Sequence, residues 1–127
     1  MINGVQISLD NDHEIQLVNE LLQSDCKDSK SEFALRLNPV VGPGSNPFFS
    51  TATKESKFGL PVLEETKEAL TDLFKNNKWL NGISFHVGSQ GMPLEKLVKG
   101  AKVSEIIENT LTNIFSAASV ISFTCRT

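Results

Sequence analysis

Three groups of residues that could bind a ligand or do chemistry fall where predicted strands end. They are Asp10 and Asn11 at the end of the first strand, Arg36 and Asn38 at the second, and His86, Gly88, Ser89 and Gln90 at the third. In a parallel α/β fold the carboxyl ends of the strands share one edge, which is the functional side. We therefore expect a carboxylate, a guanidinium, an imidazole and a hydroxyl to converge on one rim, where they could hold a ligand.

Each of these residues also has an ordinary structural interpretation. A histidine such as His86 on a strand is more often a hydrogen-bonded core residue than a ligand contact. Arg36 alone would be an ion-pair or surface arginine, and Ser89 alone would be a helix cap, for which serine is common. Gly88 and Gly91 alone would be turn residues. The residue types by themselves therefore leave the site open.

The elements that must position these residues alternate between strand and helix. Period-2 apolar positions predict a strand over residues 4–10, and Asn11 with Glu14 predicts a capped helix after it. We expect this helix to bury one face, formed by Ile15, Val18, Leu21 and Leu22. Residues 33–39 predict a second strand, followed by a long loop over residues 40–59. We expect the next helix to begin at Pro61 and to bury Leu63, Leu70 and Phe74.

Residues 82–88 predict a third strand, and Pro93 suits the first turn of a third helix. The predicted apolar face of that helix is formed by Leu94, Leu97, Val98 and Ala101, and could continue through Ile107, Leu111, Ile114 and Phe115. An order of β-α-β-α-β-α without hairpin signals favours parallel strands joined by right-handed crossovers. Periodicity does not distinguish an open doubly wound sheet from a segment of a barrel.

Size and composition exclude several classes of function. The chain has 127 residues, and a complete (β/α)₈ barrel needs about 250, so a barrel interpretation implies a fragment. A net charge of −3 gives no electrostatic case for nucleic acid or an anionic membrane as partner. Apolar runs fall short of the roughly 18 residues of a membrane helix. The two cysteines lack metal-ligand spacing, so we expect no metal and a cytoplasmic, reducing compartment.

Three motifs occur together in an informative order. They are Arg36-Leu37-Asn38-Pro39, Ser56-Lys57-Phe58-Gly59 and His86-Val87-Gly88-Ser89-Gln90. In order and approximate spacing they resemble the fold-type III pyridoxal-phosphate-dependent decarboxylases of diaminopimelate, ornithine and arginine. The resemblance covers roughly residues 2–111. It implies a partial (β/α)₈ TIM barrel of the alanine racemase-like type, with about three β/α units. Residues 1–111 would be the partial cofactor-binding domain, and residues 112–127 a divergent or truncated tail.

The resemblance also assigns roles around pyridoxal 5′-phosphate as cofactor. It implies that His86 stacks its flat imidazole on the pyridine ring and that Ser89 hydrogen-bonds the phosphate. Hydroxyl and backbone N–H groups at a strand-to-helix turn are natural phosphate ligands. Gly88 would permit close backbone approach. Arg36 would face the phenolic oxygen, where a fixed cation keeps that oxygen ionised. The loop that contains Lys57 resembles the family's segment near the subunit interface, so we expect Lys57 to be structural.

The resemblance implies parts that this sequence does not match. The family's Schiff-base lysine and its glycine-rich phosphate loop have no counterpart here, and we expect neither Lys54 nor Lys57 to replace the lysine. We therefore expect the full-length parent to be a homodimeric amino-acid decarboxylase and this chain to be inactive alone. A non-catalytic homologue with a regulatory or binding role is the alternative, and the racemase branch is a weaker one. The substrate stays open, with a lean toward diaminopimelate from Gly88-Ser89-Gln90.

Overall fold

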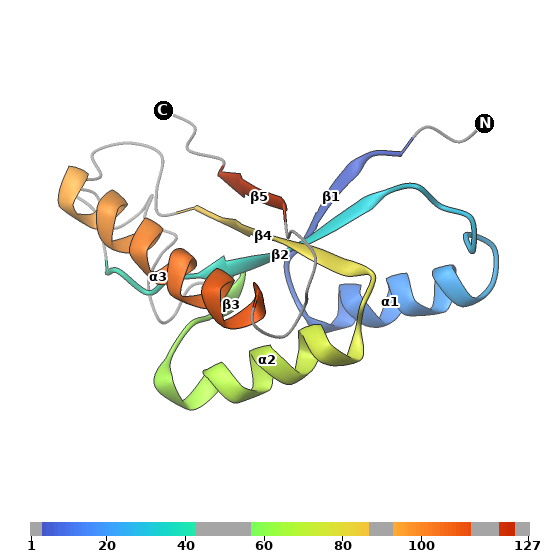
Figure 1. Ribbon diagram of the computed structural model, residues 1–127, viewed down its shortest axis with the longest axis horizontal. Helices are drawn as coiled ribbons and strands as arrows, with labels where there is room; N and C mark the ends of the chain where they lie inside the picture. The colour runs from blue at the N-terminus through green and yellow to red at the C-terminus, as the bar shows by residue number, and fades with distance from the viewer. Residues whose placement is uncertain (1–3, 43–56, 87–92, 113–119, 124–127) are drawn as a thin grey trace.

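The computed structural model describes residues 4–42, 57–86, 93–112 and 120–123. They form a parallel β-sheet with three α-helices packed along it (Figure 1). Four strands are neighbours in chain order: β1 (Gln6–Leu9), β2 (Glu32–Asn38), β4 (Leu80–Phe85) and β5 (Val120–Phe123). Every pair is parallel. A doubly wound sheet reverses its strand order at a switch point, whereas here each strand is added to the same edge. The order is that of a barrel wall.

A hydrogen bond across the sheet shows that it is curved. Ser8 on β1 and Ser84 on β4 lie on either side of β2, yet their hydroxyl oxygens are 2.5 Å apart. Strands separated by one neighbour lie roughly 9.5 Å apart in a flat sheet, which is too far for two serine side chains to meet. Only the small Ala34 of β2 lies opposite Ser8 in the register. The sheet is therefore concave on this face, as a barrel interior is.

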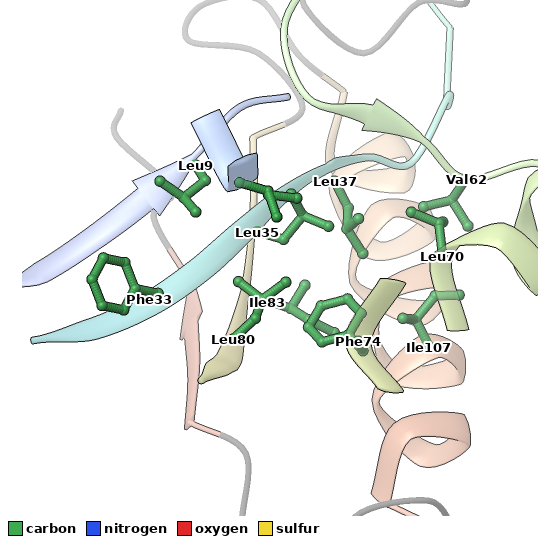
Figure 2. Packing of buried hydrophobic residues seen from close by; sticks show 11 residues of the cluster. Leu9, Phe33, Leu35, Leu37, Val62, Leu70, Phe74, Leu80, Ile83 and Ile107 are labelled. Carbon is green, nitrogen blue, oxygen red and sulfur yellow. The ribbon is translucent and has the colours of Figure 1, made fainter. Parts of the chain in front are cut away.

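The opposite face of the sheet carries the hydrophobic core (Figure 2). Alternate residues of β2 supply Phe33, Leu35 and Leu37, and the last two are almost completely buried. The helices cover them with large buried side chains: Ile15 from α1 (Asp12–Gln23), Leu70 and Phe74 from α2 (Lys67–Asn76), and Ile107 from α3 (Leu94–Thr112). Burial of each such side chain stabilises the fold by about 1.5–3 kcal/mol. The helices thus hold the sheet from outside and leave the concave face to polar residues.

The start of α1 confirms the predicted N-cap Asn11, but the bond returned by Glu14 comes from the Asp10 N–H and not from the Asn11 N–H, as a capping box would have it. The Asn11 side chain accepts from the Glu14 N–H at 3.0 Å, and the Glu14 carboxylate accepts from the Asp10 N–H at 2.6 Å. Ile15 is buried, and Val18 and Leu22 pack against the core, as predicted. Leu21 was wrongly assigned to that face, because it is 49% exposed. Six residues from Ile15 place it roughly 120° away on a helix of 3.6 residues per turn.

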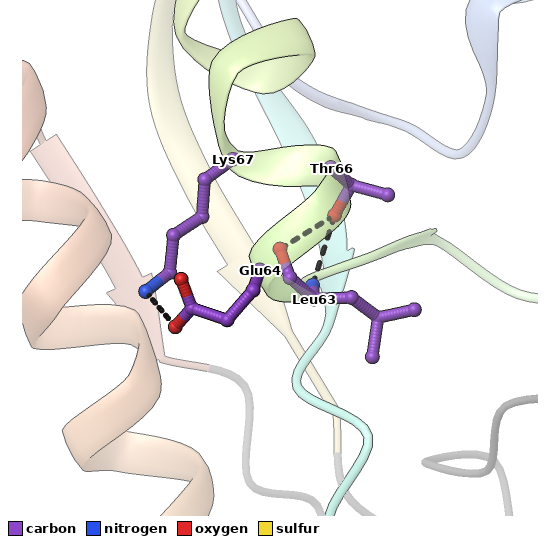
Figure 3. A network of polar contacts seen from close by, with 4 residues as sticks. All are labelled: Leu63, Glu64, Thr66 and Lys67. Carbon is purple, nitrogen blue, oxygen red and sulfur yellow. Dashed lines mark hydrogen bonds and ion pairs between the residues drawn. The ribbon is translucent and has the colours of Figure 1, made fainter.

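The predicted start of α2 at Pro61 was wrong. Pro61 forms the short strand β3 (Leu60–Pro61), and the ladder continues when the Val62 N–H donates to the Asn38 carbonyl at 2.8 Å. A 3₁₀ turn, η2 (Glu64–Thr66), precedes the helix. The Thr66 hydroxyl accepts from the Leu63 N–H at 2.9 Å and closes this turn (Figure 3). Lys67 then begins the helix, in an ion pair with Glu64 at 2.5 Å.

The face predicted for α3 is half wrong. Leu97 and Ala101 pack against Phe85 and Val41, as expected. Leu94 and Val98 are 74% and 46% exposed. Leu94 and Val98 lie on the helix face next to the one formed by Leu97 and Ala101. They point outward, because the face with Leu97 and Ala101 already packs on the sheet. The proposed continuation through Ile114 and Phe115 lies outside the described residues.

Strand β5 was not predicted. It pairs with β4 in parallel, with Gly82 opposite Val120 and Phe85 opposite Phe123. A strand after α3 continues the alternation of strand and helix that defines the rest of the chain. The domain boundary placed at residue 111 stays a prediction. None of the helices in the described part of the chain is long and apolar enough to cross a membrane.

Candidate functional site at the carboxyl ends of the strands

The carboxyl ends of β1, β2 and β4 form one rim. Asp10 follows β1, Arg36 lies near the end of β2, and His86 follows β4. Arg36 is opposite Ser84 in the β2–β4 register, so both side chains occupy the concave face with Ser8. The sheet topology therefore brings together the first residues of all three predicted groups.

Arg36 is held by contacts on two sides. Its guanidinium Nη1 lies 3.6 Å from the Asp10 carboxylate, and both side chains are 26% exposed. On another side it lies over the Phe58 ring, 5.0 Å from the centroid. The 3.6 Å separation is that of an ion pair rather than a hydrogen bond. A cation over an aromatic face is attracted by the ring quadrupole. These contacts fix the guanidinium while leaving a quarter of the side chain accessible.

The contact with Phe58 depends on close packing of the Gly59 backbone against β2. Gly59 has φ +74°, and a Cβ there would lie 3.0 Å from the Arg36 carbonyl oxygen. Only glycine adopts this conformation without strain and leaves room for that oxygen. Lys57, whose Nζ lies 5.2 Å from the Phe58 centroid, is exposed. Sequence reasoning missed the Phe58 contact, because nothing in the spacing links the loop to Arg36.

Asn38 is a buried residue of the rim that stabilises the turn after β2. It is only 3% exposed, and its side-chain oxygen accepts from the Val40 N–H at 3.0 Å. Val40 has φ +50°, so the chain turns sharply directly after β2. Asparagine side chains that bond the backbone two residues on stabilise such turns. Asn38 therefore stabilises the turn by which the chain leaves β2 at the rim, beside the end of β4.

His86 is half-buried and directly follows β4. Leu37 of β2 is opposite Phe85 of β4 in the register, and Asn38 and His86 are the next residues on these two strands. Asn38 and His86 therefore lie at the ends of adjacent strands. The other two predicted cofactor residues, Gly88 and Ser89, lie outside the described residues. The structure thus places Arg36 and His86 at one rim, and the cofactor roles of all four stay predictions.

Metal and disulfide chemistry find little support at this rim. Within the ranges that the structure describes, no three His, Cys, Asp or Glu side chains gather as metal ligands. Cys26 is a free, half-buried thiol three residues after the end of α1, and Cys125 lies outside those ranges. The groups available for binding are therefore a held cation, an imidazole and hydroxyls.

The fold and this rim define a segment of a parallel β/α barrel with a polar concave face. The chain belongs to the pyridoxal-dependent decarboxylase family, because the model of that family's pyridoxal binding domain matches residues 1–122. The predicted family and the predicted partial barrel are thereby confirmed. Residues 112–122 also fall within the match, beyond the range over which the motifs gave a resemblance.

Similar proteins include several diaminopimelate decarboxylases. That of Archaeoglobus fulgidus is 34% identical over 96 residues, covering 75% of this chain and 22% of the relative. That of Helicobacter pylori is 29% identical over 116 residues, covering 87% and 27%. A crystal structure of the Helicobacter pylori enzyme complexed with L-lysine superposes with a TM-score of 0.72 and 23% identity, covering 91% of this chain and 28% of that one. The chain therefore spans about a quarter of the length of these relatives.

Proposed function

We propose that this chain is the cofactor-binding barrel segment of a diaminopimelate decarboxylase-type enzyme. The observation that carries the proposal is Arg36, a partly exposed cation held by Asp10 and Phe58 at the strand-end rim of a family member. When bound, pyridoxal 5′-phosphate supplies an electron sink for decarboxylation of an amino acid. The remaining task of the chain's own residues is to bind and orient that group.

The residues at the rim fit an anionic, flat cofactor. Pyridoxal 5′-phosphate carries a phosphate and an ionisable phenolic oxygen, and the accessible part of Arg36 offers a fixed positive charge to such an oxygen. The contacts with Asp10 and Phe58 restrict the guanidinium before any ligand arrives, which lowers the entropy lost on binding.

His86 is proposed to lie against the pyridine ring, since its half-buried imidazole follows the strand next to Arg36. Ser89 is proposed to donate to the phosphate, and Gly88 to let the backbone approach it. The family match through residue 122 supports both assignments, because it includes the whole His86-Val87-Gly88-Ser89-Gln90 motif. A face contact with the ring would also restrict how the cofactor tilts.

The proposed substrate of the full-length parent is diaminopimelate. The similar curated proteins carry that name, and the Helicobacter pylori structure contains L-lysine. Ornithine and arginine are the competing substrates. The resemblance further supports a homodimeric, cytoplasmic parent. These 127 residues alone are proposed not to decarboxylate, because none of their lysines matches the lysine to which the family attaches its cofactor.

A graft tests this function. In the Helicobacter pylori enzyme, the segment aligned with residues 1–122 would be replaced by this sequence, so that the host supplies the missing lysine and phosphate loop. We expect the graft enzyme to bind pyridoxal 5′-phosphate and release CO₂ from diaminopimelate faster than from L-ornithine or L-arginine. The 127-residue chain alone should release none. Turnover by the isolated chain would contradict the proposal, as would a folded graft that binds no cofactor.

The same graft separates the alternative, a non-catalytic homologue. The absent lysine favours that alternative for the chain by itself. A graft that folds and binds the cofactor but does not release CO₂ from any of the three substrates would show that the rim has lost its catalytic geometry. The chain would then be better described as a degenerate binding segment.

A further inference from the structure

Two serines on the concave face are joined by a hydrogen bond that spans a whole strand. Ser8 of β1 and Ser84 of β4 bond through their hydroxyl groups, although β2 lies between their strands. Ser84 is buried. The interior of a (β/α)₈ barrel is usually filled by bulky branched side chains. A bonded pair of hydroxyl groups in this position therefore indicates a role other than filling the core.

Small residues around the pair allow the two hydroxyl groups to meet. Ala34 of β2 is opposite Ser8 in the register with β1, and opposite Gly82 in the register with β4. At this level the three strands thus carry a hydroxymethyl group, a methyl group and a single hydrogen. A branched side chain on β2 would stand between the serines, because strand side chains rise roughly perpendicular to the sheet. The small side chains at this level therefore permit the bond across β2.

Each serine lies two residues before a residue of the rim. Asp10 is two residues after Ser8, and His86 is two residues after Ser84. Side chains two residues apart on a strand share a face and are separated by roughly 6.6 Å along it. The hydroxyl bond is thus one strand repeat below the rim, on the same two strands that carry the Asp10 carboxylate and the His86 imidazole.

Arg36 lies on the strand between these two strand ends. It is opposite Ser84 in the register of β2 with β4, and its guanidinium forms the ion pair with Asp10 of the β1 end, at 3.6 Å. The position of this guanidinium relative to His86 therefore depends on how β1, which supplies Asp10, is set against β4, which supplies His86.

The backbone ladders alone leave the relation between β1 and β4 adjustable. In the described sheet each of these strands is paired with β2, and they are not paired with each other. The rotation between neighbouring strands varies from roughly −10° to −35°, so two successive rotations allow the outer strands a wide range. A direct bond between Ser8 and Ser84 restricts this range. Both serines belong to described strands, so the bond does not depend on what sequence precedes or follows them.

We propose that Ser8 and Ser84 are a positioning pair for the cofactor site. Their bond fixes β1 against β4, and thereby sets the separation between the ion pair of Asp10 with Arg36 and the imidazole of His86. Neither hydroxyl group touches the cofactor in this assignment. The inference rests on the proposed function, because it concerns the site at which Arg36 and His86 would bind pyridoxal 5′-phosphate.

A matched pair of variants in the graft enzyme tests this role. Threonine and valine have nearly the same shape, but only threonine has a hydroxyl group. Ser8→Thr should therefore keep the bond and bind pyridoxal 5′-phosphate like the unaltered graft. Ser8→Val should weaken cofactor binding about threefold to tenfold, the factor that corresponds to one typical hydrogen bond. Titration of each apo-enzyme, followed by cofactor absorbance, gives both dissociation constants.

The spectrum of the bound cofactor is a readout that a loss of stability alone does not change. Arg36 is proposed to face the phenolic oxygen, and the ionisation of this oxygen changes the absorbance of the cofactor. At saturating cofactor, Ser8→Val should shift the absorbance toward the form with a protonated oxygen, because the guanidinium is less well placed. Ser8→Thr should leave the spectrum of the graft unchanged.

A double-mutant cycle distinguishes one shared bond from two independent roles. Ser8→Ala and Ser84→Ala should weaken cofactor binding by the same factor, and the double variant should bind no more weakly than either. Both single changes remove the same bond, so their effects should not add. Circular dichroism checks that each variant folds. If Ser84→Ala unfolds the graft, the comparison of Ser8→Thr with Ser8→Val decides alone.

The unaltered graft separates the two ways in which the account could fail. If it folds but binds no cofactor, both the proposed function and the positioning role are overturned. If it binds the cofactor, and Ser8→Val matches Ser8→Thr in affinity and spectrum, the positioning role alone is overturned. Additive losses for Ser8→Ala and Ser84→Ala would overturn it as well, since the two hydroxyl groups would then act separately.

Discussion

At the scale of single residues, the position of Arg36 depends on two segments that are distant in the sequence. Asp10 comes from the end of β1 and Phe58 from the segment before β3, and both contact one guanidinium. Exposed ion pairs contribute little to stability, typically below about 1 kcal/mol. The contacts with Asp10 and Phe58 therefore matter more for orienting the Arg36 guanidinium than for stabilising the fold. A rigid cation loses less entropy when a ligand binds.

A substitution of Gly59 tests how tightly its backbone packs on β2 beside Arg36. Gly59→Ala adds a Cβ 3.0 Å from the Arg36 carbonyl oxygen at φ +74°, so it should cost about 2–3 kcal/mol of unfolding free energy. Gly42→Ala is the matched control. Gly42 also has positive φ, +90°, but among the described residues its Cβ would meet only the flexible end of Lys96, at 3.4 Å. Urea denaturation of both variants measures the difference. Equal losses would mean that Gly59 does not pack tightly on β2.

The site could be predicted from sequence only as far as its strand-end positions. Arg36 and His86 were placed on the rim correctly, because a parallel sheet collects the carboxyl ends of its strands. The partners of Arg36 could not be predicted. Asp10 was expected on the same rim but not as the ion-pair partner of Arg36, and Phe58 lies in a loop, where periodicity carries no signal. Contacts across a fold arise from register and loop path, which spacing does not encode.

At the scale of elements, local chemistry predicted the starts of some elements and missed others. The cap that Asn11 places on the Glu14 N–H is a short-range pattern, so it was predictable. Pro61 was misleading because proline fits both the first turn of a helix and an edge strand. The ladder bond from Val62 to Asn38 decided between them, and that bond joins residues far apart in the chain. Strand β5 was missed for the same reason: its evidence is pairing with β4.

Substitution of the N-cap Asn11 tests how much its side-chain hydrogen bond stabilises the start of α1. Asn11→Ala removes the acceptor for the Glu14 N–H and should lower the free energy of unfolding by about 1 kcal/mol. Asn11→Ser keeps an acceptor of similar capping strength, so it should change stability by only a few tenths of a kcal/mol. Urea denaturation followed by circular dichroism compares the two. A loss of equal size in both variants would show that the side-chain bond is not what stabilises the helix start.

At the scale of the whole molecule, strand order and curvature decided what periodicity left open. An open doubly wound sheet and a barrel segment have the same alternation of strands and helices. The order β1-β2-β4-β5 and the bond between Ser8 and Ser84 distinguish them. The motifs at residues 36–39, 56–59 and 86–90 identified the family before either was known, and the match over residues 1–122 confirms it.

The most direct test of the cofactor-binding account compares the chain's two histidines in the graft enzyme. His86→Ala should weaken pyridoxal 5′-phosphate binding about tenfold, the loss expected when a ring contact worth roughly 1.4 kcal/mol is removed. His13→Ala should leave it unchanged, because His13 is exposed in the first turn of α1 and belongs to none of the three motifs. Titration of each apo-enzyme, followed by cofactor absorbance, gives both affinities. Equal affinities for the two variants would contradict the assignment of His86 to the cofactor site.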